Sequence, residues 1–244
     1  MPITVHEEDV DKVLYVLNKE NMLRELEKNG SLSTSYRLIL SGEAVYVSLK
    51  AILMEDKRDG QRHAVVAICN IDAQMKRDQE FAEAQEAAMR DALTGVKNQR
   101  AFVKTEKEFN VAIADGKCDA FALAVCSVMD VDRLLAAGET ERAEGMLTEA
   151  CALICDIFRH SPVYRLGEDQ FTVVLKNRDL KNRDRLMELL QAAVDENRNR
   201  GGEALALATG IAHFDPAVDA SLQSVAERAN IAMYENRLVL ERKK

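Results

Sequence analysis

The sequence contains no tryptophan, only four histidines, and no long run of apolar residues or of charges of one sign. Its 33 basic and 41 acidic residues give a net charge of −8, and without a basic cluster we expect no nucleic-acid binding. The longest apolar runs, such as AVVAIC at 64–69, are too short to cross a bilayer, which predicts no membrane span. The start of the chain has neither a basic segment nor an apolar export signal, which favours the cytoplasm.

The sequence also lacks a cysteine pattern typical of metal binding. There is no CxxC pair, and the number of cysteines is odd: Cys69, Cys118, Cys126, Cys151 and Cys155. With so few histidines, this composition argues against a structural metal site. Cys151 and Cys155 lie four residues apart in a helical pattern and could share a face. Small buried hydrophobes are the commoner role of cytosolic cysteine, so we predict structural rather than redox roles.

The first 72 residues predict helices followed by an antiparallel meander. Apolar residues at helical spacing within 7–28 indicate one or two helices, closed by Asn29-Gly30. Three strand-like runs follow at 35–40, 44–53 and 62–71, separated by turn residues. One face of the middle run should be buried, because its apolar residues alternate with more polar ones: Val45, Val47, Leu49, Ala51 and Leu53.

A single connecting helix is predicted for residues 73–90. This segment contains no glycine, proline or β-branched residue and is rich in Ala, Glu and Gln. A thin apolar seam in heptad-like spacing consists of Met75, Phe81, Gln85 and Ala88 or Met89. The seam is adequate for a dimer contact, and packing of the helix on its own domain is an equal alternative.

From residue 91 onward, helical and strand patterns alternate. Helices are predicted at 99–114, 139–159, 179–197 and 218–241. Strands are predicted at 119–129 and 204–214, and residues 163–175 form two strands hinged at Gly167, Glu168 and Asp169. This order suits an antiparallel-containing sheet covered by helices, so the predicted fold class is α+β.

Five motifs in this half resemble the GGDEF family of diguanylate cyclases, in the family's order. They are DALTGVKNQRAF at 91–102, MDVD at 129–132, RLGEDQF at 165–171, TGIAHF at 209–214 and AERANIAMYENR at 226–237. The resemblance implies a nucleotidyl-cyclase-like sheet flanked by helices over residues 91–244. It also implies cyclic di-GMP signalling and a homodimer.

The first 72 residues resemble the second half of a PAS domain. HEEDVDKVLYVL at 6–17 is similar to a PAS helix, and the three strands are similar to the last three of that fold. CNIDAQMKRDQE at 69–80 resembles the segment that leads from PAS domains into GGDEF partners. The first strands are missing, so either the chain comes from something longer or the half-domain completes its sheet with another chain. A bound sensor ligand is therefore not expected.

The resemblance implies a reaction that joins two GTP molecules into cyclic di-GMP, which needs a divalent metal and a base. By position, Asp130 would be the first metal carboxylate, Val131 would lend a backbone carbonyl, and Asp169 would be the first acid of the turn. Mg²⁺ is the cofactor implied if nucleotide binding persists, and no other cofactor is expected. Each acid also has a plainer interpretation, Asp130 as a helix cap and Asp169 as a hairpin-turn residue.

The turn itself, Gly167, Glu168, Asp169, Gln170 and Phe171, departs from the family's G-G-D-E-F. Gln170 replaces the second acid with a neutral amide, which binds Mg²⁺ more weakly and cannot act as a base. Glu168 replaces a glycine that would let the backbone approach phosphate with a positive φ, and it adds a negative charge. We therefore predict no catalytic residue in this turn.

Other functional positions of the family are altered as well. Leu134 and Leu135 occupy the Phe and Lys positions that follow the metal-binding strand, and no base-reading Asn follows them. Phe158 and Ser161 occupy the ends of the inhibitory R-x-x-D motif, so no inhibitory site is expected. Arg237 is the one residue that could replace the phosphate-facing Lys of the family.

Together these residues predict a signalling protein with three parts: a partial PAS-like domain at 1–72, a connecting helix at 73–90, and a degenerate GGDEF domain at 91–244. We expect a catalytically inactive domain that acts through dimerisation or through a signalling protein partner. The alternative is an active or altered enzyme that makes cyclic di-GMP or binds another nucleotide through Asp130 and Asp169. Arg165, on the strand before the turn, is predicted to join a structural ion pair.

Overall fold

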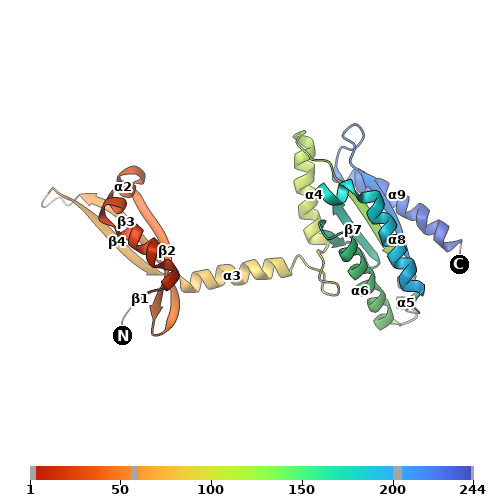
Figure 1. Ribbon diagram of the computed structural model, residues 1–244, viewed down its shortest axis with the longest axis horizontal. Coiled ribbons are helices and arrows are strands. Elements are labelled where there is room, and N and C mark those ends of the chain that lie inside the picture. Colours follow the sequence, from red (N-terminus) through yellow and green to blue (C-terminus); the bar gives the residue numbers. More distant parts are fainter. Residues whose placement is uncertain (1–3, 56–59, 200–204, 243–244) are drawn as a thin grey trace. The chain divides into compact units, whose positions relative to one another are not determined.

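The computed structural model describes residues 4–55, 60–199 and 205–242. The chain divides into two compact units, Met1–Gln85 and Glu86–Lys244, which are described separately below (Figure 1). The division falls inside the segment predicted to connect the two halves. Within the described ranges, no helix is long and apolar enough to span a membrane.

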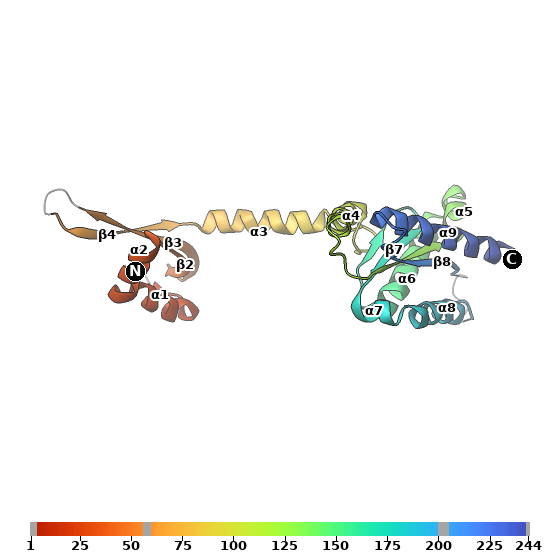
Figure 2. The same ribbon diagram turned by 90° about the horizontal axis from the view of Figure 1, so that it is seen from above.

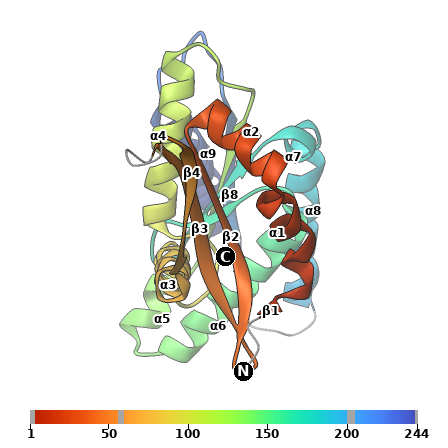
Figure 3. The ribbon, with the colours of Figure 1, turned by 90° about the vertical axis from the view of Figure 1, so that its left-hand side faces the viewer.

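The first unit is a four-stranded antiparallel sheet in the order β1-β2-β3-β4, with two helices on one face. Its strands are β1 (Thr4–Val5), β2 (Ser31–Leu40), β3 (Glu43–Glu55) and β4 (Arg62–Asn70). Its helical elements are η1 (Glu7–Asp9), α1 (Val10–Leu17) and α2 (Lys19–Asn29), and Figure 3 shows α1 and α2 against the same side of the sheet. The predicted helices and the three-stranded meander are confirmed, and β1 adds a short edge strand that the sequence did not indicate.

Alternation along β3 decides which face of this sheet is buried. Val47, Leu49 and Ala51 are buried against the helices, and Tyr46 and Lys50 are exposed, as predicted. Ser48, which the alternation places with Tyr46 and Lys50, is buried instead. The core of the unit combines helix residues with these strand residues: Val13, Leu26, Tyr36, Val47, Leu49 and Ala51. β4 is exposed along its whole length, because it forms the edge of the sheet beyond the cover of the helices.

The boundaries of α2 follow from its capping residues. The Asn18 side chain accepts hydrogen bonds from the backbone N–H groups of Glu20 and Asn21, which satisfies two of the free donors of the first turn. Gly30 ends the helix in the left-handed conformation, with φ of 75°, and its N–H donates to the Leu26 carbonyl. The predicted stop at Asn29-Gly30 is therefore confirmed.

The connecting helix α3 (Asp72–Ala87) is shorter at its end than the predicted range of 73–90. Every side chain of this helix is at least partly exposed, including Met75 at 42% and Phe81 at 65%. Met89 lies beyond the helix and packs against the core of the second unit, so the predicted seam does not reach it. The Asn98 side chain donates to the carbonyls of Ala88 and Arg90 and holds this segment in a turn.

The second unit is an antiparallel sheet in the order β6-β7-β5-β8, covered by helices on both faces. Its strands are β5 (Ala122–Val128), β6 (Val163–Arg165), β7 (Gln170–Leu175) and β8 (Leu207–His213). Its helices are α4 (Gln99–Ala114), α5 (Val131–Ala136), α6 (Thr140–Ile157), α7 (Asn177–Lys181), α8 (Arg183–Asn199) and α9 (Leu222–Glu241). Figure 2 shows α4 and α9 on one side of the sheet and α6 and α8 on the other. The predicted α+β class is confirmed.

The central strand β5 is buried on both faces, which explains its continuous apolar sequence. Ala124 and Cys126 face the core formed with α6 and α8, while Leu123 and Val125 face the core formed with α4 and α9. The predicted strand at 119–129 is therefore correct in type, three residues too long at its start and one too long at its end.

The cysteines follow the structural prediction only in part. Cys126 and Cys151 are buried, and burial raises the pKa of the Cys126 thiol to about 12. Cys151 and Cys155 share a helix face, as predicted, and a hydrogen bond from Cys151 lowers the pKa of Cys155. Cys69 is exposed on the edge strand β4, so the expectation of burial is wrong there, because β4 has no layer covering it.

Candidate functional site

The candidate site lies where the end of β5 meets the start of β7. These strands are antiparallel, Ser127 pairs with Gln170, and the Val128 N–H donates to the Asp169 carbonyl at 2.8 Å. Asp130 follows β5 and Asp169 precedes β7, so both acids lie at the same end of the sheet. The topology thus gathers the residues for which the resemblance implies metal binding.

The Asp169 carboxylate is engaged by two neighbouring side chains. Ser127 Oγ donates to Asp169 Oδ2 at 2.7 Å, and Arg237 Nη1 lies 3.5 Å from the same oxygen. Arg237 comes from α9 and also pairs with Glu241 at 3.3 Å. The ion pair is partly buried, with Asp169 23% and Arg237 27% exposed, so water screens it less than a surface pair. The negative charge of Asp169 is therefore compensated within the domain.

Gln170 is held by a complementary amide from α9. Its Nε2 donates to Asn230 Oδ1 at 2.7 Å, and Asn230 Nδ2 in turn donates to the Ala226 carbonyl at 3.0 Å. A carboxylate at position 170 has no N–H to offer, and its oxygens would face the Asn230 oxygen. The amide that replaces the family's acid thus links the turn to α9.

The turn between β6 and β7 closes without a left-handed residue at Glu168. The Leu166 N–H donates to the Gln170 carbonyl at 3.0 Å, and Arg165 Nη2 donates to the Glu168 carbonyl at 2.9 Å. Among the residues that the structure describes, positive φ outside glycine occurs at Ser41, Asp130 and Asn177. The conformation that a glycine would permit at position 168 is therefore not used, and the Glu168 side chain is exposed.

Asp130 does not cap α5 with its side chain, so its plainer sequence interpretation is wrong. Its backbone occupies the N-cap position but has a φ of 67°, whereas capping residues are typically extended, and the carboxylate makes no capping hydrogen bond. Asp130 Oδ1 lies 3.6 Å from Arg133 Nε one turn further on. Val131 is fully buried in the core beside α6 and α8.

Arg165 forms the structural ion pair that the sequence predicted. Its Nη1 lies 3.0 Å from Asp91 Oδ1, which also accepts hydrogen bonds from the Thr94 backbone and hydroxyl. Burial raises the pKa of Asp91, but the bonds from Thr94 and Arg165 outweigh it, so the net pKa is lowered. The pair joins the segment before α4 to the hairpin turn.

Three positions at which the sequence departs from the family's motifs have structural roles. Leu134 is 6% exposed in the core beneath α6, and Phe158 is 1% exposed in the same core. Ser161 Oγ donates at 2.7 Å to the buried Asp179 carboxylate, which fixes the segment before β6. These side chains therefore stabilise the fold at positions where the family's motif residues are replaced.

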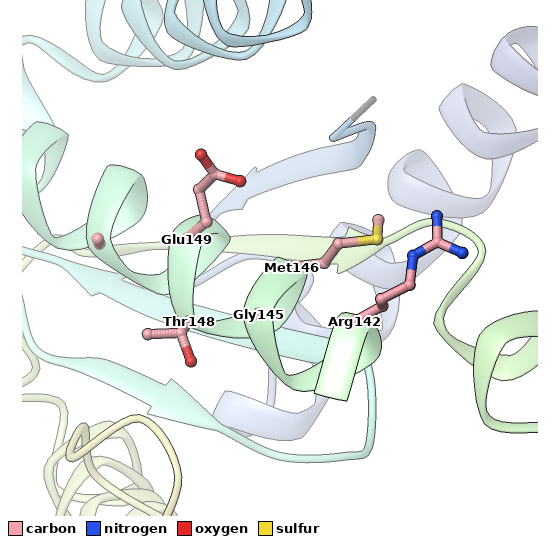
Figure 4. Close-up of a pocket in the computed structure, with 6 residues that line it drawn as sticks. Arg142, Gly145, Met146, Thr148 and Glu149 are labelled. Atoms are coloured by element: carbon pink, nitrogen blue, oxygen red, sulfur yellow. The ribbon is translucent and has the colours of Figure 1, made fainter. Parts of the chain in front are cut away.

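A shallow hollow of about 570 Å³ lies along α6 and shares no residue with the turn. Its lining comes from a single helix: Arg142, Gly145, Met146, Thr148, Glu149 and Ala152 (Figure 4). Binding sites usually join polar groups that converge from several elements around an apolar cleft. We assign no function to this hollow.

Sequence reasoning missed Ser127, Asn230 and Asn236. Ser127 Oγ bonds Asp169, Asn230 bonds Gln170, and Asn236 Oδ1 accepts from the Thr209 N–H of β8 at 2.9 Å. A weak signal existed, since Asn is unfavourable within a helix and a serine is unusual in an otherwise apolar strand. Their partners, however, lie 27 to 60 residues away in the chain.

The antiparallel sheet with a β-hairpin at one end and helices on both faces defines a diguanylate-cyclase-type α+β domain. The family described as "Diguanylate cyclase, GGDEF domain" matches residues 88–239, more than half of the chain. The chain therefore belongs to the GGDEF family. Among curated proteins, none matches significantly.

Solved structures share this fold at low sequence identity. The diguanylate cyclase SiaD of Pseudomonas aeruginosa, crystallised with its activator SiaC, is 21% identical with a TM-score of 0.54. The match covers 68% of this chain and 64% of the SiaD chain, which is less than two thirds of that protein. The coiled coil and GGDEF domain of DgcB from Caulobacter crescentus, in complex with c-di-GMP, is 20% identical with a TM-score of 0.57, covering 68% of this chain and 89% of that one.

Proposed function

We propose that this chain is a signalling protein whose GGDEF domain is catalytically inactive and acts by protein interaction. The observation that carries the proposal is the set of bonds that Asp169 and Gln170 make in the turn. Asp169 is bound by Ser127 and Arg237, and the Gln170 amide donates to Asn230. Both turn positions at which the family has an acid, 169 and 170, thus make bonds within the domain.

The residues at this end of the sheet do not fit Mg²⁺, the metal that the family's reaction implies. Mg²⁺ needs hard oxygen ligands, usually carboxylates together with substrate phosphates. Asp169 Oδ2 already accepts from Ser127 and faces the Arg237 cation, while Gln170 is neutral. Mg²⁺ at Asp169 would compete with Ser127 and Arg237 for Oδ2 and would bring a divalent cation beside the Arg237 charge. We therefore derive no catalytic step through a metal.

Nucleotide phosphates are disfavoured at the same place. Arg237, the candidate phosphate-binding residue, is shared between Asp169 and Glu241, so a phosphate would compete with two carboxylates for it. The exposed Glu168 adds a further negative charge at the turn. A like charge at contact distance costs about 1 kcal/mol in water and more where water is excluded. These charges support a domain that binds neither GTP nor its product.

We assign the first unit to a partial PAS-like domain, with bounds 1–72, followed by a connecting segment at 73–90 and the GGDEF domain at 91–244. Its antiparallel sheet with two helices on one face, and its exit through α3, support this assignment. The exposed apolar residues Met75 and Phe81 support a contact of α3 with a partner or a second copy. SiaD, a chain of the same fold class, is described with a protein activator, which is in keeping with regulation by protein contact.

A cyclase assay combined with nucleotide titration tests the proposed function. Purified full-length chain is incubated with GTP and either Mg²⁺ or Mn²⁺, beside an active diguanylate cyclase, and cyclic di-GMP is quantified by chromatography. Isothermal titrations with GTP, ATP and cyclic di-GMP are run on the same preparation. We expect no product and no binding heat.

Two outcomes would overturn this function. Cyclic di-GMP production above the background of a heat-denatured sample would make the chain an enzyme. Binding of any of the three nucleotides, lost in an Asp169→Ala variant, would make it a nucleotide receptor that uses the turn. Asp195→Ala on α8 is the matched control, since it removes an exposed carboxylate away from the turn.

A further inference from the structure

The last helix, α9, presents an exposed apolar stripe flanked by charges. The stripe consists of residues three or four apart, which lie on one helix face: Glu227, Ile231, Tyr234, Leu238 and Arg242. Ile231 is 58%, Tyr234 60% and Leu238 55% exposed. Other residues of the same helix are buried in the core: Leu222, Val225, Ala229 and Met233. α9 is therefore apolar on a second face that its own domain leaves uncovered.

The order of residues along the stripe makes it complementary to itself. An acid, Glu227, stands at its start, three large apolar residues fill its middle, and a base, Arg242, stands at its end. An antiparallel copy of the same stripe would place acid against base at both ends and apolar residues together in the centre. A twofold symmetric contact requires this kind of self-complementary surface.

We propose that α9 binds a second copy of this chain through an antiparallel helix pair, with the twofold axis between residues 234 and 235. In this register Ile231 lies opposite Leu238 of the second copy, and the two Tyr234 rings flank the axis. Glu227 lies opposite Arg242 of the second copy, and the symmetry repeats this pair at the other end. The proposal builds on the interaction role proposed above and names the surface and the partner.

Charge decides the orientation of the pair. A parallel arrangement would set Glu227 beside Glu227 and Arg242 beside Arg242, and like charges in contact are unfavourable. Arg228 pairs with the buried Asp219, and Glu241 pairs with Arg237, within the domain. Glu235 is exposed at the edge of the stripe and would lie near its own copy at the axis in a parallel and in an antiparallel pair alike, so it does not decide between them. Glu227 and Arg242 therefore decide the orientation.

The contact is small. One helix face with three apolar residues buries less than the roughly 1,600 Å² of a standard interface, so we expect a weak, concentration-dependent dimer. A weak contact suits a signalling protein, because other contacts of the same assembly raise its effective concentration and switch it on.

Charge exchange tests the register directly. The full-length chain is compared with Glu227→Arg, Arg242→Glu and the double variant Glu227→Arg/Arg242→Glu by sedimentation velocity over a concentration series. Each single variant opposes like charges at two symmetric places, which should weaken dimerisation about tenfold. The double variant restores both opposite-charge pairs and should dimerise like the unaltered chain. Glu188→Arg on α8 is the matched control and should leave the dimer unchanged.

Three results would overturn the proposal. The unaltered chain could stay monomeric up to about 1 mM, the weakest Kd that we expect for a contact of this kind. In that case the stripe would not bind a second copy and would bind a different partner. The single variants could dimerise as strongly as the unaltered chain, or the double variant could fail to recover. Circular dichroism of every variant checks that the fold is intact. The nucleotide titrations are independent of this series, so failure of the dimer is distinguishable from failure of the proposed function.

Discussion

Single residues at the hairpin turn show how a substitution becomes part of the structure around it. Gln170 is not simply an acid that was lost, because its Nε2 donates to Asn230 on α9. Asp169 is retained, but its carboxylate accepts a hydrogen bond from Ser127 and pairs with Arg237. We therefore expect that restoring one residue of the family's motif will not restore the surroundings that the reaction needs.

We predict that Gln170→Glu alone will not create cyclase activity. Glu168 would still be present and a base-reading Asn would still be absent. The new carboxylate also cannot donate a hydrogen bond to Asn230, which should cost about 1 kcal/mol of stability. Cyclic di-GMP formation and thermal unfolding of the variant are the measurements. Recovered turnover would show that Gln170 is the sole defect and that this account of the turn is wrong.

A second prediction at this scale concerns pH and the first unit. The hydrogen bonds and charge of Arg37 lower the pKa of Asp9 to about 2. A pKa that is lower in the folded state than in the unfolded chain stabilises the fold. This stabilisation is fully present above the pKa of Asp in the unfolded chain, about 4, and is lost as the pH falls through the pKa of Asp9 in the folded state. We expect Asp9→Asn to lower the Tm of this unit at pH 7, with the difference from the unaltered chain shrinking between about pH 4 and pH 2.

Thermal unfolding followed by circular dichroism from neutral to acid pH measures this dependence. Asp11→Asn is the matched control, because Asp11 is an exposed carboxylate two residues further along the chain, in α1. A difference in Tm that is the same at pH 7 and at about pH 2.5 would contradict the Asp9–Arg37 linkage.

At the scale of elements, the close contact between α9 and β8 fixes the position of α9 on the sheet. At Gly210 an added Cβ would lie 2.2 Å from the Met233 nitrogen and 2.3 Å from the Ala229 oxygen. Both are backbone atoms of α9, which cannot move aside as a side chain can. Asn236 adds a hydrogen bond from the same helix to the Thr209 N–H. This close contact sets the position of Asn230 and Arg237 over the turn.

We predict that Gly210→Ala destabilises the second unit by about 3 kcal/mol or prevents its folding, because one element must shift to admit the methyl group. Urea unfolding provides the measurement. Gly145→Ala is the matched control, since Gly145 lies within α6 with open space around its Cβ position. We expect that variant to be neutral or stabilising by up to about 1 kcal/mol. Equal stability of the two variants would contradict the packing argument.

The whole molecule consists of two units with separate cores, and this predicts separate folding. The core of Met1–Gln85 comes from α1, α2, β2 and β3, and the cores of Glu86–Lys244 come from α4 to α9 and the strands between them. We expect the fragment 86–244 to fold alone and to unfold cooperatively. Its Tm should lie within a few degrees of the Tm of one of the unfolding transitions of the full chain. Calorimetry of the fragment and of the full chain measures this. An insoluble or non-cooperative fragment would show that the first unit is needed for the second to fold.

The sequence alone determined the elements whose signals are local. Period and composition predicted α4 at 99–114, which is the observed range, and Asn29-Gly30 predicted the end of α2. The start of α9 was placed at residue 218 instead of Leu222. Asp219 is the reason, because its buried carboxylate binds the Asp215 N–H and Arg228 and keeps this segment out of the helix. No local pattern reveals a partner nine residues away in the chain.

The sequence by itself also determined the family, since its motifs follow the order of GGDEF domains and the family match covers residues 88–239. Only the tertiary structure decided what the altered residues do. It brought Ser127 of β5, Asp169 of the hairpin turn and Arg237 of α9 together across 110 residues of the chain, and it left one face of α9 exposed. The physical reason is that helix periodicity and turn chemistry act over a few residues, whereas ion pairing and exposure depend on which distant elements the folded chain packs side by side.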